Sequence, residues 1–380
     1  MSAPHSLKLH VGVLPPGSNF VPFLSGDLLA ALEFGLAEAH IEAELVVEFA
    51  GYNGDVKVVL PKVQHLLFGQ RVACVVAPLN VSLVEKLAGQ FESQRVPLIA
   101  LSLGEDPLYE TAQNPFVFVN SFYLWQSAWM CGYMGAQRFG PRAATMVALH
   151  EGGYNLTFAF QLGLEAGNGS LLQTAVTHTN SNREDPSPSI AEIAAREPDF
   201  IWAAYSGKEA ASFLAAYEAS GCKQRIPVLG LPPLVDEHVR KAAGDATLGT
   251  YFVTRGPRGA EADGLTTALA QAIGRQPHPY ALLAYESAHL IAAAARTIST
   301  PGRLSVDLPL ALRHVEFQGP RGLARFDNGG GTEVPFCLRR VTPGNDSVEE
   351  VEAPPLLNDQ CLLARKKLVK RGWVNPYLCA

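Results

Sequence analysis

The sequence predicts an α/β fold in which parallel sheets carry helices on both faces. Short apolar runs of strand length alternate with helix-length segments along most of the 380 residues. The runs are rich in Val, Ile and aromatic side chains and do not alternate with polar ones, so both faces of each strand are expected to be covered. A chain of this length also exceeds what one core usually holds. Together these observations predict two doubly wound lobes.

The individual elements follow from this alternation. Strands are predicted at 9–15, 43–49, 73–79, 97–101, 116–120, 144–149, 171–176, 199–205, 227–231 and 249–253. Helices with apolar residues at helical spacing are predicted at 25–39, 81–95, 125–139, 155–167, 186–198, 207–221, 259–275 and 279–298. The helix at 207–221 ends on a glycine, and the next strand follows within a few residues, which is typical of a βαβ unit.

A distinctive stretch, FQGPRGLARFDNGGG, runs from Phe317 to Gly331, after the predicted helices of both lobes. Its Gly-rich turn predicts a β-hairpin with strands at 323–326 and 334–341. Residues 343–360 are Pro-rich and acidic and are expected to form a loop. A last helix is predicted from Cys361 to Gly372.

Composition excludes several classes of protein. The net charge is −6, and the one basic cluster, Ala364–Arg371, is expected to be a solvated helix face, so no nucleic-acid partner is predicted. The sequence has no stretch of about twenty apolar residues, so no membrane span is predicted. The first residues do not resemble a secretory leader, so the protein is either cytoplasmic or its leader has been removed. Of the six cysteines, Cys361 and Cys379 could pair in an oxidising compartment.

Motifs for catalysis are missing from the sequence. It has no GxGxxG after the first strand, no GxxxxGK[ST], no HExxH and no GxSxG. His150 ends a predicted strand and Glu151 follows it; these two residues could act as acid and base, although a structural histidine is the simpler interpretation. No cofactor and no metal site are predicted.

Polar and aromatic residues gather just after the C-terminal ends of the predicted strands. They are Asn19, Phe20, Asn80, Ser102, Leu103, Gly104, Phe122, Tyr123, Tyr154, Tyr205 and Ser206. In doubly wound folds ligands bind at these ends, where helix N-termini also offer free N–H groups. The sequence therefore predicts a ligand site between strand ends, without catalytic apparatus.

Several motifs together resemble one family. Phe317, Gly319, Pro320, Gly322, Phe326 and Asp327 match its Phe-x-Gly-Pro-x-Gly-x-x-x-Phe-Asp run, and Tyr285-Glu286-Ser287 stands where the family has Tyr-Asp-Ala. Over about residues 7–342 the chain resembles type I periplasmic binding proteins of the branched-chain amino-acid (Leu/Ile/Val) receptor group, the solute-binding components of ABC transporters.

The resemblance implies two lobes joined by a three-strand hinge, with the ligand in the cleft between them. Lobe one would comprise 7–120 and 254–318. Lobe two would comprise 121–253 and 319–342, and 343–380 would pack on it as a C-terminal extension. The stretch from Phe317 would be the last return into lobe two. The protein would then be periplasmic or extracytoplasmic, and cytoplasmic in the alternative case.

The resemblance also implies a ligand site. Asn80, Ser82, Ser102, Leu103 and Gly104 would bind a ligand carboxylate, with Tyr123 nearby, and Asn19 and Phe20 after the first strand. Tyr154 would pack on the ligand from lobe two, beside Ser206. The family's acidic partner for the ligand ammonium falls on Pro232, so that carboxylate is missing.

Burying an unpaired ammonium is costly. Either another acid, Glu151 or Asp236, replaces the missing one, or the ligand lacks an amine. A small carboxylate or amide with an apolar or aromatic body is the expected ligand.

Three functions are consistent with these patterns. The first is a solute-binding receptor that serves the membrane subunits of an ABC importer and performs no catalysis. The second is a cytosolic ligand sensor of the same fold that controls a regulator. The third, an enzyme using His150 and Glu151, has no motif in its support.

Overall fold

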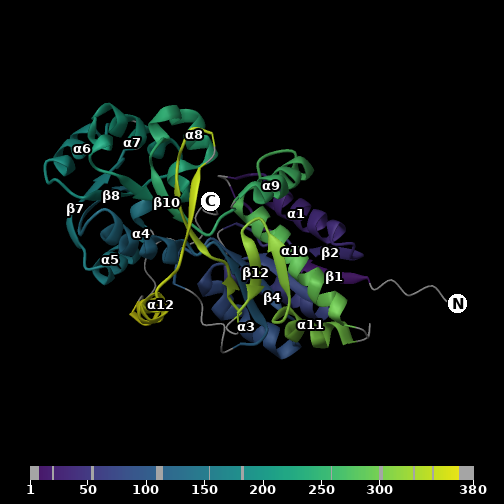
Figure 1. The fold of residues 1–380 in the computed structure, drawn as a ribbon. Helices are drawn as coiled ribbons and strands as arrows, with labels where there is room; N and C mark the ends of the chain where they lie inside the picture. The colour runs from purple at the N-terminus through teal and green to yellow at the C-terminus, as the bar shows by residue number, and fades with distance from the viewer. Residues whose placement is uncertain are drawn as a thin grey trace.

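The computed structural model describes residues 8–18, 21–52, 55–107, 114–153, 155–180, 184–257, 259–298, 303–327, 330–344 and 346–367. Within these ranges the chain forms two α/β lobes, each built on its own sheet (Figure 1). The ten strands predicted between residues 9 and 253 are all present, so the predicted α/β class with parallel sheets is confirmed.

The first sheet is wholly parallel in the part of the chain that the structure describes. Its strands are β1 (Leu9–Val13), β2 (Ala43–Val47), β3 (Cys74–Pro78), β4 (Leu98–Ser102) and β5 (Val117–Ser121), in the order β2-β1-β3-β4-β5. The helices of this lobe are α1 (Leu24–Glu38), α2 (Val56–Gln64), α3 (Val81–Gln94), α9 (Gly259–Ile273), α10 (Pro279–Thr297) and α11 (Leu304–Leu312). Every residue of β3, β4 and β5 is buried, which is why these strands read as continuous apolar runs.

The second sheet combines parallel strands with an antiparallel edge. Its strands are β6 (Arg142–Ala148), β7 (Ser170–Thr177), β8 (Phe200–Ala204), β9 (Val228–Gly230), β10 (Tyr251–Thr254), β14 (Phe336–Arg340) and β15 (Ser347–Val351), in the order β15-β14-β10-β9-β8-β6-β7. The helices are α4 (Leu124–Arg138), α5 (Leu156–Ala166), α6 (Ser187–Ala194), α7 (Gly207–Ala219) and α8 (Glu237–Ala243). Phe160 of α5 stacks on Trp202 of β8, with ring centroids 4.8 Å apart, in the core of this lobe.

The prediction of a β-hairpin with strands at 323–326 and 334–341 is wrong. Its first strand, β12 (Gly322–Phe326), pairs with β11 (Glu316–Gly319) and β13 (Thr332–Glu333) in a small antiparallel sheet. Its second strand is β14, which pairs with β10 and β15 instead. The small sheet is joined to lobe one through Gly331, which bridges to Val119 of β5. The chain therefore enters the second sheet later than the predicted boundary at 319.

The stretch from Phe317 contributes a buried ion pair to this junction. Arg321 and Glu286 are both fully buried, and two guanidinium nitrogens of Arg321 contact the Glu286 carboxylate at 2.5–3.0 Å. Arg321 also donates to Ser121 O (2.6 Å) and Asn120 Oδ1 (2.5 Å). The two sequence motifs, one on α10 and one on β11–β12, thus meet in a single hydrogen-bonded network at the end of β5.

Within the described residues three crossings connect the two sheets, and Arg255 of the second crossing contacts one residue from each of the other two. The crossings follow β5, β10 and β13. The Arg255 guanidinium carbon lies 4.4 Å from the ring centroid of Tyr123, on the first crossing, and 3.9 Å from that of Phe336, where the third crossing ends. Burial lowers the pKa of Arg255 to about 10, so its side chain stays charged at neutral pH.

The segment after residue 343 extends lobe two. The loop predicted at 343–360 is wrong in part, because β15 lies within it and pairs antiparallel with β14. Helix α12 (Leu356–Lys367) begins earlier than predicted and contacts α4, where Trp129 Nε1 donates to Gln360 Oε1 at 2.5 Å. Cys361 is buried, and Cys379 lies outside the described residues, so their pairing stays a prediction. None of the described helices has the length and hydropathy of a membrane span.

Candidate functional site

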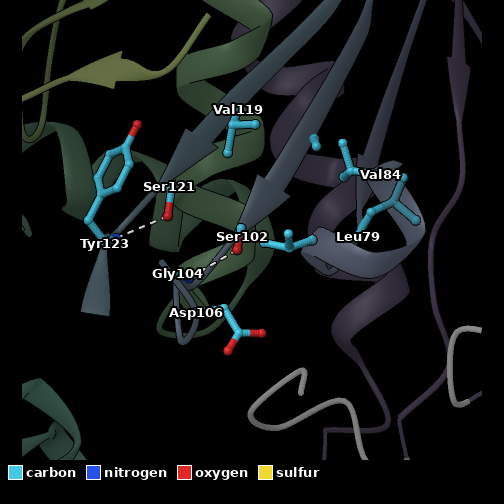
Figure 2. A pocket seen from close by; sticks show the side chains of 10 residues that line it. Leu79, Val84, Ser102, Gly104, Asp106, Val119, Ser121 and Tyr123 are labelled. Carbon is cyan, nitrogen blue, oxygen red and sulfur yellow. Dashed lines mark hydrogen bonds between the residues drawn. The ribbon is translucent and has the colours of Figure 1, made fainter. Parts of the chain in front are cut away.

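The carboxyl ends of β3, β4 and β5 carry three polar side chains, of which Asn80 and Ser102 belong to the predicted strand-end clusters. Asn80 Oδ1 accepts from Leu83 N (2.9 Å) and caps α3. Ser102 Oγ accepts from Gly104 N, and Ser121 Oγ accepts from Tyr123 N, both at 3.0 Å (Figure 2). All three side chains are at most 7% exposed. Each serine hydroxyl can still donate its own hydrogen, so this edge of the sheet offers donors to an anion.

The space beside these serines is small. A cavity of about 20 Å³ is lined by Ser102, Gly104, Asp106, Ser121 and Tyr123, together with apolar residues from β4, β5, α3 and the turn after β3. This volume holds about one water molecule. Of the residues predicted to bind a ligand carboxylate, Ser102 and Gly104 line this small cavity, while the body of a ligand requires a larger space.

Asp106 of lobe one and Asn155 of lobe two form a contact between the lobes. Asn155 Nδ2 donates to Asp106 Oδ1 at 2.7 Å. Burial raises the pKa of Asp106, and the hydrogen bond from Asn155 opposes that rise. Sequence reasoning did not predict this pair, because its members follow different strands of different lobes. Since the contact spans the two lobes, it is available only when they approach each other.

Replacing Asn155 with alanine is expected to weaken ligand binding several-fold. The loss corresponds to about 1 kcal/mol for one hydrogen bond that favours the closed arrangement. Calorimetric titration with a bound solute would measure the affinity, and small-angle scattering would report the opening. Gln161→Ala is the matched control, because exposed Gln161 lies on α5, the helix that Asn155 precedes, and donates to Glu165 of the same helix on the surface. Equal affinities for the two variants would contradict a role for the contact in closure.

Lobe two presents a carboxyl group at the corresponding strand ends. The Ser206 hydroxyl donates to Glu151 Oε1. Burial raises the pKa of Glu151, and the hydrogen bond from Ser206 opposes the rise. Asp236, the other acid considered for a ligand ammonium, accepts from Val239 N (2.9 Å) and caps α8. Of the two acids, Glu151 is thus the one not committed to a helix cap.

A second, larger cavity of about 600 Å³ lies where the lobes meet. Leu103 and Leu282 line it from lobe one, Phe122 lines it from the first crossing, and Pro232, Val235 and Phe252 line it from lobe two. Further walls come from the second crossing and from the segment that leads into α10 (276–279). Burial lowers the pKa of His278, in this last wall, to about 4, so the histidine is neutral at pH 7. A mostly apolar cavity of this volume fits a small organic molecule.

The predicted site residues are distributed unequally between these cavities. Asn19, Phe20 and Tyr154 lie outside the described residues, so their roles stay predictions. Leu103 and Pro232 line the larger cavity. Tyr123 is 1% exposed and lines the small cavity, with its ring against Arg255 at the hinge. Ser82 and Ser206 are half-buried at the starts of α3 and α7.

The sequence signals for the remaining walls were weak. The walls at the start of α8, at Thr266 of α9 and around the start of α10 do not follow a strand, so the clusters after strand ends did not include them. Their residues reach the cavity only because the two lobes face each other. No group of three or more His, Cys, Asp or Glu side chains suited to a metal ion occurs in the described part of the chain.

Comparisons with known proteins place this geometry in a family. The family model described as periplasmic binding protein matches residues 9–346. The structure is similar to an ABC transporter substrate-binding protein from Sphaerobacter thermophilus (TM-score 0.74, 23% identity, 93% of this chain and 99% of that chain). It is also similar to an R. palustris solute-binding protein in complex with benzoate (TM-score 0.66, 19% identity, 90% of this chain and 96% of that chain).

The structure is also similar to LivJ, a branched-chain amino-acid transporter substrate-binding protein from Streptococcus pneumoniae, in complex with isoleucine (TM-score 0.65, 15% identity, 91% of this chain and 100% of that chain). A search of curated proteins finds no significant match. At these identities the structural likeness establishes the fold.

Proposed function

Because this chain belongs to the periplasmic binding protein family, we propose that it is a solute-binding receptor of an ABC importer. Its two lobes close on a small organic ligand by hinge motion and deliver it to the membrane subunits of the transporter. The protein works outside the cytoplasm and performs no chemistry on the solute. The observation that carries this proposal is the 600 Å³ apolar cavity where the two lobes meet.

The lining of the cavity favours a carboxylate or amide with an apolar or aromatic body. Leu103, Phe122 and Phe252 supply apolar surface. Pro232 stands where the resemblance expects an acid for a ligand ammonium. The solved relatives bind benzoate, which has no amine, and isoleucine, which has one. The absence of a carboxylate at Pro232 supports a ligand of the first kind.

A thermal-shift screen tests the function and the ligand class together. Benzoate, 4-hydroxybenzoate, benzamide, leucine and isoleucine would each be added to the purified protein. A ligand that binds only the folded state at a hundredfold excess over Kd stabilises it by about 2.7 kcal/mol, which raises Tm. We expect the amine-free compounds to raise Tm and the amino acids to leave it unchanged.

The other outcomes of the screen distinguish the receptor function from the claim that the ligand lacks an amine. If leucine or isoleucine raises Tm and Glu151→Gln removes that rise, then Glu151 replaces the missing acid. The receptor function would then stand and the amine-free class would be wrong. If no small organic solute from this set or a wider one raises Tm, the receptor function itself loses its support.

A further inference from the structure

We propose that Arg255 is a positioning residue of the hinge: its guanidinium, stacked over Tyr123 and Phe336, holds the three crossings in the arrangement in which the lobes meet. This inference rests on the lobe closure of the proposed function, and it names the contact that favours closure before a ligand binds. Removing the stack opens the ligand-free protein and thereby weakens the binding of a solute that contacts both lobes.

The crossings are short, so contacts between them govern how the lobes are oriented. The first consists of Phe122 and Tyr123, between β5 and α4, and the third of Val334 and Pro335, between β13 and β14. The second begins at Arg255, directly after β10. Single segments of this kind absorb the φ and ψ changes of a hinge motion. A side chain that joins all three therefore restricts that motion.

Stacking holds the Arg255 guanidinium in place. Its carbon lies 3.9 Å from the ring centroid of Phe336 and 4.4 Å from that of Tyr123. Nε is buried and has no hydrogen-bond partner in the described part of the chain. A cation is attracted to the face of an aromatic ring, and the attraction grows when both groups are withdrawn from water. Arg255 therefore binds the two neighbouring crossings through their rings.

Tyr123 is itself fixed at the first crossing. Its side chain is 1% exposed, and its φ of +54° lies in the left-handed region, which costs a residue with a Cβ. Its N–H donates to Ser121 Oγ at 3.0 Å. Its hydroxyl lies beside Gly331, where a Cβ would be only 3.2 Å away, so the ring also reaches the segment that leads to the third crossing. Movement of the first crossing therefore displaces this ring from Arg255.

A stack suits a hinge better than a hydrogen-bonded ion pair does. Arg321 anchors the end of β5 through directional hydrogen bonds, which weaken steeply when their angles change. The attraction between a guanidinium and a ring changes more gradually as the cation moves over the face. The stack is formed here while the lobes are in contact through Asp106 and Asn155. It therefore stabilises the closed arrangement without locking it.

Small-angle scattering of the whole protein without a ligand tests the inference. Arg255→Met keeps an unbranched side chain and removes the charge, and it is expected to increase the radius of gyration of the ligand-free protein. Phe336→Leu removes one ring and is expected to cause a smaller increase. Arg255→Lys keeps a cation and is expected to stay close to wild type. With saturating benzoate, the radius of gyration of Arg255→Met is expected to return to the wild-type value, and its affinity for benzoate to fall about three- to tenfold.

The matched control is Arg340→Met. Arg340 lies over the ring of Tyr251, 5.5 Å from its centroid, and both residues belong to the sheet of lobe two, so this stack does not join two crossings. The control is expected to leave the radius of gyration unchanged, and a thermal melt checks that each variant is folded.

An unchanged radius of gyration in folded, ligand-free Arg255→Met would overturn the inference, as would an equal increase in Arg340→Met. If Arg255→Met does not fold, an unchanged value in Phe336→Leu overturns it instead. These measurements need no ligand. Failure of every solute in the thermal-shift screen would therefore count against the receptor function and leave the role of Arg255 in the hinge to be decided by scattering.

Discussion

Replacing Arg321 with methionine is expected to lower the free energy of unfolding by about 3–5 kcal/mol. The side chain is fully buried against Glu286, so its removal leaves a carboxylate in the core without its cation. The same change removes the donors to Asn120 and Ser121, which lie at the end of β5. Urea titration followed by circular dichroism would measure the loss.

Two further variants show that the loss comes from the buried charge. Arg325→Met removes an arginine that is about half exposed and pairs with Glu333 and Glu316 on the surface, so a change of about 1 kcal/mol or less is expected. The double variant Arg321→Met/Glu286→Leu removes both charges, and its stability is expected to exceed that of Arg321→Met alone. A double variant less stable than the single one would show that packing and backbone contacts, and not the unpaired carboxylate, account for the loss.

Gly104→Ala is expected to destabilise the protein by at least about 2 kcal/mol and to abolish ligand binding. Gly104 has φ +79°, a conformation that costs an L-residue. A Cβ there would lie 2.6 Å from both Ser121 Oγ and Tyr123 Cα. The first crossing would therefore have to move away from the end of β4, which separates the strand ends that face the cleft.

The comparison for this variant is Gly89→Ala. Gly89 is exposed in α3, and a Cβ there has no neighbour within 4 Å, so alanine is expected to stabilise the helix by up to about 1 kcal/mol. Thermal melts would rank the two variants, and calorimetry with the solute found in the screen would measure binding. If Gly104→Ala keeps wild-type stability and affinity, the close contact between β4 and the first crossing is not required for the site.

Much of the fold could be predicted because its elements are local. Each of the strands β1–β10 coincides with an apolar run, and in the central strands β3, β4 and β5 burial on both faces explains the pattern; the edge strands β2 and β7 are largely half-buried or exposed. Helix α2 was not predicted, and it contains Pro61, which a helical pattern does not normally include. The prediction of the hairpin at 323–341 was wrong for another reason. Its turn residues indicate a reversal, but the partners of β12 and β14 lie in two different sheets.

The sequence by itself determined the α/β class, the order of strands and helices, and the gathering of polar residues after strand ends. These properties follow from periodicity and turn chemistry over a few residues. Only the tertiary structure decided which of these residues meet. Arg321 reaches Glu286, and Asn155 reaches Asp106. Each pair joins segments far apart in the chain, so its distance depends on strand pairing and on the approach of the two lobes, which no local pattern encodes.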